Sequence, residues 1–254
     1  MRVDTPSNLD SYRRTTLSCE DCGLKRLCFP RQLSEPLRQR MEHSIQRRKL
    51  LRSGEHLFHA GQNLRGLQVL RSGSVRLYRL SAQGDERTSH FVMPGEVLGL
   101  GALHGRCHPD SAQALEDARY CEIPLPVIDR LSQGNPQLPQ ALIELISEHL
   151  EETRQLLLAV GSGSATERLA AFIDNLARRR TRRSLDARSF RLSMQRKEIA
   201  NFLGLTVETV SRTLGQLQRR QLISIRGKQL CINDPDGLRS LCDPGLNNTV
   251  GVQA

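Results

Sequence analysis

The sequence has few aromatic residues and lacks the features of several protein classes. Only 4% of its 254 residues are aromatic and none is tryptophan, although the missing tryptophan carries no functional information. No apolar run is long enough to span a bilayer, and residues Met1–Pro6 lack the apolar core of a signal peptide. A phosphate-binding glycine loop, a nucleophile elbow and a His-Glu-x-x-His pattern are also missing. These absences predict a cytoplasmic protein without a membrane partner and make an enzyme the least favoured class.

Basic side chains outnumber acidic ones. Lysine and arginine total 37 against 27 aspartates and glutamates, which gives a net charge of +10. A surplus of this sign suits a polyanionic partner such as nucleic acid, with a merely soluble basic protein as the plainer alternative. The charge is concentrated in one short region, which contains Arg178, Arg179, Arg180, Arg182, Arg183, Arg188 and Arg191. This cluster comes just before the helix-turn-helix pattern described below, and this position favours DNA as the partner.

Three of the seven cysteines, Cys19, Cys22 and Cys28, lie within ten residues. A Cys-x-x-Cys pair can chelate one metal, and a third thiol can close over the same centre. Because disulfides are rare in the cytoplasm, the spacing favours a metal or an iron–sulfur cluster. A structural zinc site, a redox disulfide and unligated thiols are the alternatives, and spacing alone does not separate iron from zinc.

A four-thiolate site needs one more ligand from elsewhere in the fold. Cys121 is the first candidate, because it lies within the β-like run 120–123, and a strand could hold it rigidly against the N-terminal loop. Its plainer interpretation is an inert core cysteine. Weaker candidates are Cys107, in an expected loop, and Cys231 and Cys242, in an expected separate domain.

The texture of the chain predicts five segments. Residues 1–30 form a tail and the cysteine loop, and residues 31–125 form a domain in which a helix at 31–50 precedes short β-like runs separated by glycines. Many short strands with glycine turns predict a β-barrel or β-roll. Residues 126–160 follow as a long helix with an irregular start at Pro136 and Pro139. Residues 161–242 form a second domain, and residues 243–254 form a C-terminal tail.

The long helix carries an apolar stripe. Leu142, Leu145, Ile146, Leu150, Leu156 and Leu157 recur at helical spacing, interrupted by His149 and Thr153. Such a stripe either packs on its own domain or forms a coiled-coil seam between two chains. Glutamates at 148, 151 and 152 would make such a seam weak, so a second event could control pairing. The plainer alternative is an ordinary amphipathic helix with a solvated acidic face.

The second domain contains a helix-turn-helix pattern over residues 196–215. Gly161-Ser-Gly-Ser164 reads as a hinge, and Ser164 with Glu167 fits a capping box. Gly204 supplies the turn between the two helices, and the second helix is followed by a β-hairpin wing. Candidate DNA contacts are Thr206, Glu208, Thr209, Ser211 and Arg212 on or beside the second helix, and Arg226 and Lys228 on the wing.

These patterns together resemble the CRP/FNR superfamily of bacterial transcription regulators, and within it the FNR/Anr group. The resemblance is carried by Cys19-x-x-Cys22-x5-Cys28, Cys121 in Tyr-Cys-Glu-Ile-Pro124, residues 167–172 and residues 203–212. It implies an α+β protein with an N-terminal β-roll sensor domain, a long dimerisation helix and a C-terminal winged helix-turn-helix domain. It also implies an oxygen-labile 4Fe-4S cluster held by Cys19, Cys22, Cys28 and Cys121.

The resemblance implies partners as well. A homodimer would bind double-stranded DNA at palindromes of TTGAT half-sites, mainly to activate anaerobic genes, and would release DNA when oxygen degrades the cluster. RNA polymerase would contact the loop containing Gln83, Gly84, Asp85 and Glu86. Two positions depart from the pattern: Gly23 replaces a polar residue beside the cluster, and Thr153 replaces an aspartate on the dimerisation helix.

Rival sensors share the β-roll. Cyclic-nucleotide sites of this superfamily use a Gly-Glu turn and a later Arg-Ser pair; here Gly95 and Glu96 are present, but Asp110 and Ser111 stand at the later pair. An aspartate would repel a phosphate, so no cyclic nucleotide is expected. The alternative function is a CRP-like regulator that senses a small ligand, either a cyclic nucleotide or haem/nitric oxide. In this alternative the cysteines hold a structural zinc or are unligated.

Overall fold

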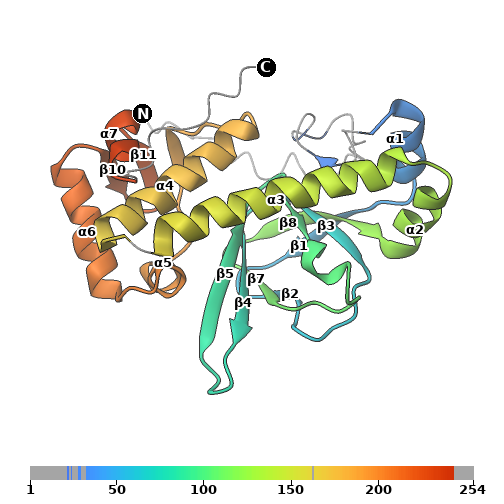
Figure 1. Cartoon of the computed structure of the whole chain (residues 1–254), viewed down its shortest axis with the longest axis horizontal. Coiled ribbons are helices and arrows are strands. Elements are labelled where there is room, and N and C mark those ends of the chain that lie inside the picture. The colour runs from blue at the N-terminus through green and yellow to red at the C-terminus, as the bar shows by residue number, and fades with distance from the viewer. Residues whose placement is uncertain (1–21, 23, 25–27, 30–32, 162, 243–254) are drawn as a thin grey trace, which may run out of the picture.

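The computed structural model describes residues 22, 24, 28, 29, 33–161 and 163–242. The predicted α+β class is confirmed: antiparallel sheets form one part of the chain, and a helical bundle with a small sheet forms the other. Figure 1 shows the long helix α3 crossing the molecule, with α1 and α2 near one end and α4 to α7 near the other. Among the described helices, none has both the length and the apolarity that crossing a membrane requires.

The β-roll consists of two four-stranded antiparallel sheets. One sheet has the order β1 (Gln46–Leu51), β8 (Ala118–Pro124), β3 (Gly66–Ser72), β6 (Val97–Leu98). The other has the order β2 (His56–Phe58), β7 (Ser111–Ala114), β4 (Val75–Leu80), β5 (Glu86–Val92). A buried cluster that includes Leu70, Val75, Val92 and Leu98 draws side chains from both sheets and forms the roll's own core. Burying one face of each sheet in this way fixes the strand register.

The helix predicted over 31–50 is shorter in the structure. Helix α1 spans Glu35–Glu42, with Pro36 in its first turn, and buries Leu37 and Met41. The periodicity suggested that the helix continued, but Gln46–Leu51 form strand β1 and pair with β8. Pairing with a neighbouring strand has therefore overridden a weak helical pattern.

The single helix predicted over 126–160 is two helices. Helix α2 spans Leu125–Gln133 and α3 spans Gln137–Gly161. Gly134 ends α2, and Pro136 disfavours helical backbone at the residue before it. Pro139 lies in the first turn of α3, where a missing backbone N–H costs little. A short 3-10 helix spans Leu100–Ala102.

The C-terminal part contains four helices and a three-stranded sheet among the described residues. The helices are α4 (Ala165–Arg182), α5 (Arg196–Leu203), α6 (Val207–Arg219) and α7 (Pro235–Ser240); the sheet has the order β10 (Ile223–Arg226), β11 (Gln229–Ile232), β9 (Ser189–Arg191). The predicted capping box at the start of α4 is present, with Glu167 N donating to Ser164 Oγ at 3.3 Å and Ser164 N donating to Glu167 Oε2 at 2.9 Å.

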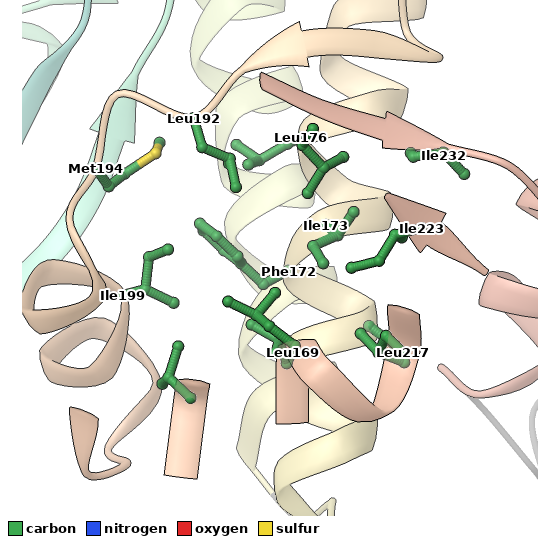
Figure 2. Packing of buried hydrophobic residues seen from close by; sticks show 14 of the residues in the cluster. Leu169, Phe172, Ile173, Leu176, Leu192, Met194, Ile199, Leu217, Ile223 and Ile232 are labelled. Atoms are coloured by element: carbon green, nitrogen blue, oxygen red, sulfur yellow. The ribbon is translucent and has the colours of Figure 1, made fainter. Parts of the chain in front are cut away.

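The core of this part is built around α4. Leu169, Phe172, Ile173 and Leu176 on α4 share a buried cluster with Leu217 on α6, and Figure 2 shows their packing. The same cluster includes Phe91 and Met93 of the β-roll. Because the cluster is continuous, the helical bundle is docked on the β-roll through apolar contact.

Candidate DNA-binding surface and cysteine site

The predicted helix-turn-helix is formed by α5 and α6. Gly204 ends α5 with φ +64°, a left-handed conformation that glycine adopts without strain. The Thr206 side chain then caps α6 by accepting from Thr209 N at 3.1 Å. Helix α6 buries Val210, Thr213, Leu214 and Leu217, which fixes the opposite face outward.

The predicted recognition residues lie on that outward face. Glu208, Ser211 and Arg212 are exposed near the start of α6. The Ser211 hydroxyl donates to Val207 O at 2.9 Å, which leaves its lone pairs free to accept from a base. Val207 is 47% exposed beside them and was missed by sequence reasoning. An exposed apolar residue in the first turn of α6 was the signal that could have identified it, because it can contact a thymine methyl group.

The predicted wing is the β10–β11 hairpin. Gly227 turns it with φ +61°, and Arg226 and Lys228 on either side are exposed. Their charges can therefore reach phosphates beside the groove that α6 would occupy.

Many arginines of the cluster at 178–191 form ion pairs within the chain. Arg178 pairs with Asp174 at 2.9 Å, Arg182 with Glu152 at 2.5 Å, and Arg191 with Glu116 at 3.2 Å. Arg179 and Arg183 both pair with the buried Glu96. Most of the cluster joins α4 and β9 to the rest of the chain, because acidic partners from the β-roll and α3 face it.

The predicted cysteine ligands are only partly described. Cys121 lies half-buried on β8, opposite Val69 of β3. Cys28 is also half-buried and packs against the cluster that contains Val69 and Phe29. Cys22 is half-buried, and Cys19 and Gly23 lie outside the described residues. No group of three or more metal-ligating side chains occurs among the residues that the structure describes.

The donor chemistry fits an iron–sulfur centre. Thiolates are the ligands of such clusters. Cys28 packs against an apolar layer that includes Phe29, Leu33, Leu67 and Ile123, and Cys121 lies two residues before Ile123 on β8. Cys107 is exposed, and Cys231 and Cys242 lie in the C-terminal part, which agrees with their weaker candidacy.

The stripe predicted on the long helix divides into two faces. Leu142 and Leu145 pack against the β-roll, and Leu156 is 8% exposed within its own chain. Ile146, Leu150 and Leu157 are exposed, and so are Ile143 and Leu158, which the prediction missed. Ile143, Leu150 and Leu157 lie seven residues apart, the spacing of a coiled-coil seam, and this spacing could have identified Ile143.

Thr153 and His149, the two residues that interrupt the predicted apolar stripe, differ in where their side chains make contacts. The Thr153 hydroxyl donates to His149 O at 2.8 Å, so it is satisfied within the helix. His149 is half-buried, and its ring lies edge-on to His90 of β5 with centroids 5.0 Å apart. Burial lowers the pKa of His149, despite the opposing effect of nearby Glu96 and Glu152. His149 therefore faces its own β-roll.

The predicted polymerase-contact loop joins β4 to β5. Gln83, Gly84 and Asp85 are exposed, and Gly84 has φ +87°. The Ser81 hydroxyl accepts from Gln83 N at 3.2 Å and from Asp85 N at 3.1 Å, which orders the turn. Glu86 pairs with Arg76 at 2.7 Å.

A cavity of about 690 Å³ lies where the β-roll meets α3 and the end of α4. Gly95 and Glu96 line it, together with His90, His149 and Arg183. Asp110 does not line it and pairs instead with Arg79 at 3.0 Å. The two halves of the nucleotide site considered from the sequence are therefore not both at this cavity.

Comparisons with known proteins cover both parts of the chain. Residues 167–241 match a family described as the Crp-like helix-turn-helix domain, and residues 48–135 match the cyclic nucleotide-binding domain. The chain is 40% identical over 233 residues to the anaerobic regulatory protein of Haemophilus influenzae, covering 92% of this chain and 90% of that one.

Further relatives agree. The chain is 40% identical over 225 residues to the fumarate and nitrate reduction regulatory protein of Escherichia coli K12, covering 89% of this chain and 90% of that one. The solved structure of FixK2 from Bradyrhizobium japonicum superposes with a TM-score of 0.70 at 26% identity, covering 76% of this chain and 96% of that one.

Proposed function

The chain belongs to the CRP/FNR family of dimeric, DNA-binding transcription regulators, and from this premise we propose that it senses oxygen through an iron–sulfur cluster. Its family makes it a regulator and not an enzyme. The observation that carries the proposal is that Cys28 packs against the apolar cluster containing Val69, and that Cys121 is the strand partner of Val69. The names of the relatives, an anaerobic regulator and a fumarate and nitrate reduction regulator, support it.

The cluster would be held by Cys19, Cys22, Cys28 and Cys121. Four thiolates hold a 4Fe-4S cluster. When bound, the cluster would supply the sensing chemistry, because oxygen would degrade it. The residues around Cys28 would connect the cluster site to α3, the proposed dimerisation helix. Phe29 shares its buried cluster with Leu138 and Ala141 near the start of α3.

This packing offers a path from cluster to dimer. When the thiolates are fixed, Phe29 is held against Leu138 and Ala141, and α3 is held on the β-roll with its outer face exposed. Ile143 and Leu150 lie on that outer face. Loss of the cluster frees the loop and weakens support for α3. A coupling of only ~1–3 kcal/mol between the two sites is enough to change DNA affinity by up to a hundredfold or so.

In the dimer, the two α6 helices would enter successive major grooves about 34 Å apart on one face of the DNA. Arg212 would pair with guanine, and Glu208 would accept a hydrogen bond from cytosine. Ser211, Thr206 and Thr209 complete the contact surface of α6, and Arg226 and Lys228 would bind phosphates. We propose palindromic operators with TTGAT-type half-sites, at which the protein mainly activates anaerobic genes.

Activation would require a contact with RNA polymerase. The ordered loop at Gln83, Gly84 and Asp85 projects from the β-roll and is available for it. Glu86 is engaged by Arg76 and is better placed to support the loop than to bind a partner.

The proposal is tested by anaerobic purification of the full chain. Iron, acid-labile sulfide and zinc are assayed, and absorbance and operator binding are followed as air is admitted. About four irons and four sulfides per chain, with colour and DNA binding both lost in air, support the oxygen sensor. A colourless protein that binds one zinc, or no metal after reconstitution, overturns the proposal of an iron–sulfur cluster. The proposal that the protein binds DNA would still stand.

A second candidate is a regulator that senses a small ligand in the β-roll, with structural zinc or unligated cysteines. The cavity of about 690 Å³ and the matched cyclic nucleotide-binding domain favour it. Against a cyclic nucleotide, Glu96 is already neutralised by two arginines and Asp110 is engaged by Arg79. Calorimetric titration with cAMP tests this candidate, and the appearance of a Soret band after haem addition tests its haem-based form.

A further inference from the structure

A buried ion pair joins the β-roll to the DNA-binding helices. Glu96 lies in the turn between β5 and β6, and Arg179 lies near the end of α4. Their side chains are 8% and 4% exposed. Arg179 Nε donates to Glu96 Oε1 at 2.8 Å, and a terminal nitrogen donates to Oε2. Arg183, one turn further on, lies 3.2 Å from Oε1. The two hydrogen bonds from Arg179 form a bidentate fork, which fixes the orientation of the guanidinium relative to the carboxylate as well as their separation.

The terminal nitrogen of Arg179 that binds Glu96 Oε2 makes two further contacts. It donates to the backbone carbonyl of Phe91 and lies 3.3 Å from His90 Nε2. Burial and the adjacent Arg179 lower the pKa of His90 to about 3, so the ring is neutral and its nitrogen can accept. His149 of α3 packs against the other side of His90. The β-roll, α3 and α4 therefore meet at one polar cluster inside the protein.

A buried ion pair needs a reason beyond stability. Burial alone would raise the pKa of Glu96, but Arg179 and Arg183 lower it, so the carboxylate stays charged. Apolar side chains of similar size often stabilise a core as well as a buried ion pair does. The best attested advantage of such a pair is that it specifies one arrangement of the elements it joins.

In this protein the elements joined are the β-roll and α4, and the quantity that the ion pair can specify is the angle between them. Helix α4 buries Leu169 and Ile173 in the same core as Leu217 of α6 (Figure 2). Because this core is closely packed, the two helices should move together. Helix α4 has 18 residues, so it is about 27 Å long. A tilt of about 10° about its C-terminal end displaces its other end by about 5 Å, which exceeds the rise of about 3.4 Å per base pair.

A second contact constrains the same interface. The Asn201 carboxamide on α5 accepts from Thr88 N at 2.7 Å and donates to Glu86 O at 2.7 Å. Both groups belong to β5, the edge strand of its sheet. The Asn201 contacts and the Glu96–Arg179 ion pair lie at two separate points of the interface. Together they limit both rotation and tilt of the DNA-binding helices relative to the β-roll.

We propose that Glu96 and Arg179 are positioning residues for DNA recognition. Their ion pair sets the angle between the β-roll and α4 within each protomer, and thereby sets the separation of the two recognition helices in the dimer. This inference rests on the proposed binding of palindromic operators as a dimer. It assigns to the pair a role in reading the spacing of half-sites, separate from reading their bases.

The test uses full-length, cluster-loaded protein and three DNA duplexes with identical half-sites. One duplex has the native spacing, and the others have one base pair added or removed at the centre. For Glu96→Gln and Arg179→Gln, we expect affinity for the native spacing to fall about 10-fold, within the ~5–150-fold range of coupled sites. Affinity for the altered spacings should change less than about 2-fold, so spacing preference is lost. Arg179→Lys keeps the charge without the fork, and its loss should be intermediate.

The matched control is Arg239→Gln. Arg239 has a side chain that is 59% exposed, and it pairs with the largely buried Asp174 at 3.4 Å and the exposed Asp236 at 3.3 Å, both within the helical bundle. This variant should keep the wild-type ratio of affinities. Thermal unfolding and sedimentation establish that each variant is folded and dimeric. If a single variant does not fold, the double variant Glu96→Met/Arg179→Met removes both charges of the fork, and Arg183, whose side chain is 17% exposed, is left to solvent. This double variant should show the same loss of spacing preference.

Two results overturn the inference. One is a wild-type ratio of affinities in folded Glu96→Gln and Arg179→Gln, and the other is an equal loss on all three duplexes, which indicates a role in stability or base contact only. A wild-type protein that binds none of the duplexes contradicts the proposed function itself, so the two failures are distinguishable.

Discussion

Cys121 on β8 is the antiparallel partner of Val69 on β3. Directly paired residues point to the same face of a sheet, and Val69 is buried in the apolar cluster against which Cys28 packs. Ile123, two residues further along β8, lies in that cluster as well. The strand register therefore places Cys121 on the face of the sheet that borders this cluster.

The first prediction concerns this thiol. Cys121→Ser should prevent cluster assembly and lower anaerobic iron content to the background of a reconstitution blank, because a hydroxyl is a poor ligand for iron at neutral pH. Serine is close to cysteine in size and Cys121 is only half-buried, so the fold should persist. Iron assay, visible absorbance and far-UV circular dichroism measure the two effects.

Cys231→Ser is the matched control, because Cys231 is also half-buried on a strand, β11, but lies in the C-terminal part. It should assemble a normal cluster. If Cys121→Ser retained full iron and sulfide, the fourth ligand would have to be another residue.

The second prediction concerns base recognition. Arg212→Ala should keep the cluster and the dimer but lose preference for the operator, at a cost of ~1–3 kcal/mol per base contact. Arg226→Ala on the wing should instead weaken binding to all sequences alike and reduce the salt dependence of affinity by about one phosphate contact. Fluorescence anisotropy on operator and scrambled DNA separates the two patterns. Full discrimination by Arg212→Ala would contradict its assignment.

The third prediction concerns the exposed face of α3. Leu150 is 67% exposed in one protomer and lies at the middle of the seven-residue spacing. Leu150→Glu should abolish the dimer even with the cluster present, because it places two carboxylates in an apolar seam. Glu144→Gln alters a charge on the exposed surface of the same helix, outside the seam, and should remain dimeric. Sedimentation velocity under anaerobic conditions decides, and a dimeric Leu150→Glu protein would locate the interface elsewhere.

Thr153 gives the fourth prediction. Its hydroxyl is satisfied by His149 O, so it can enter the seam without an unmet hydrogen bond. Thr153→Asp should raise the dissociation constant of the cluster-free dimer by about 10-fold or more, since like charges across an interface cost several kcal/mol. Analytical ultracentrifugation of the cluster-free proteins tests this, with Thr153→Val as the uncharged control. An unchanged monomer content in Thr153→Asp would show that the residue lies off the interface.

Local sequence signals predicted those parts of the fold that depend on neighbouring residues. The capping box of Ser164 and Glu167, the turn at Gly204 and the cap at Thr206 all appear as expected, because each is set by residues three or four apart. The class of the β-roll followed from its glycines. The resemblance to a family added the candidate site residues that spacing alone left open.

The features that could not be predicted from the sequence depend on contacts between residues far apart in the chain. The seven arginines looked like a patch for DNA, but Arg179 is neutralised by Glu96, which lies 83 residues away in the sequence. Likewise, the stripe on the long helix did not reveal that Leu156 faces inward and Ile143 outward. Periodicity gives the existence of a face, but only packing against the β-roll decides which side is covered.

The last prediction concerns His90 and acid stability. Its folded pKa is about 3, because burial and Arg179 lower it, with smaller contributions from His149 and Arg183 and an opposing one from Glu96. In the unfolded chain the pKa returns to about 6.5. Below that pH the unfolded state binds more protons than the folded state, so the free energy of unfolding falls. Between pH 7.5 and 5.5, His90 should account for a loss of about 1.4 kcal/mol.

His90→Gln should lack this loss, because glutamine can still accept from Arg179 and does not titrate. Urea unfolding of the cluster-free protein at both pH values measures the difference, and exposed His104→Gln, the control, should follow the wild type. The measurement stays above pH 5, because Glu96 has a pKa lowered to about 2 and its stabilising charge begins to be lost only near pH 4.5, the ordinary value of a glutamate. Equal pH dependence in wild type and His90→Gln would mean that His90 is solvated and that the polar cluster around Glu96 is open to water.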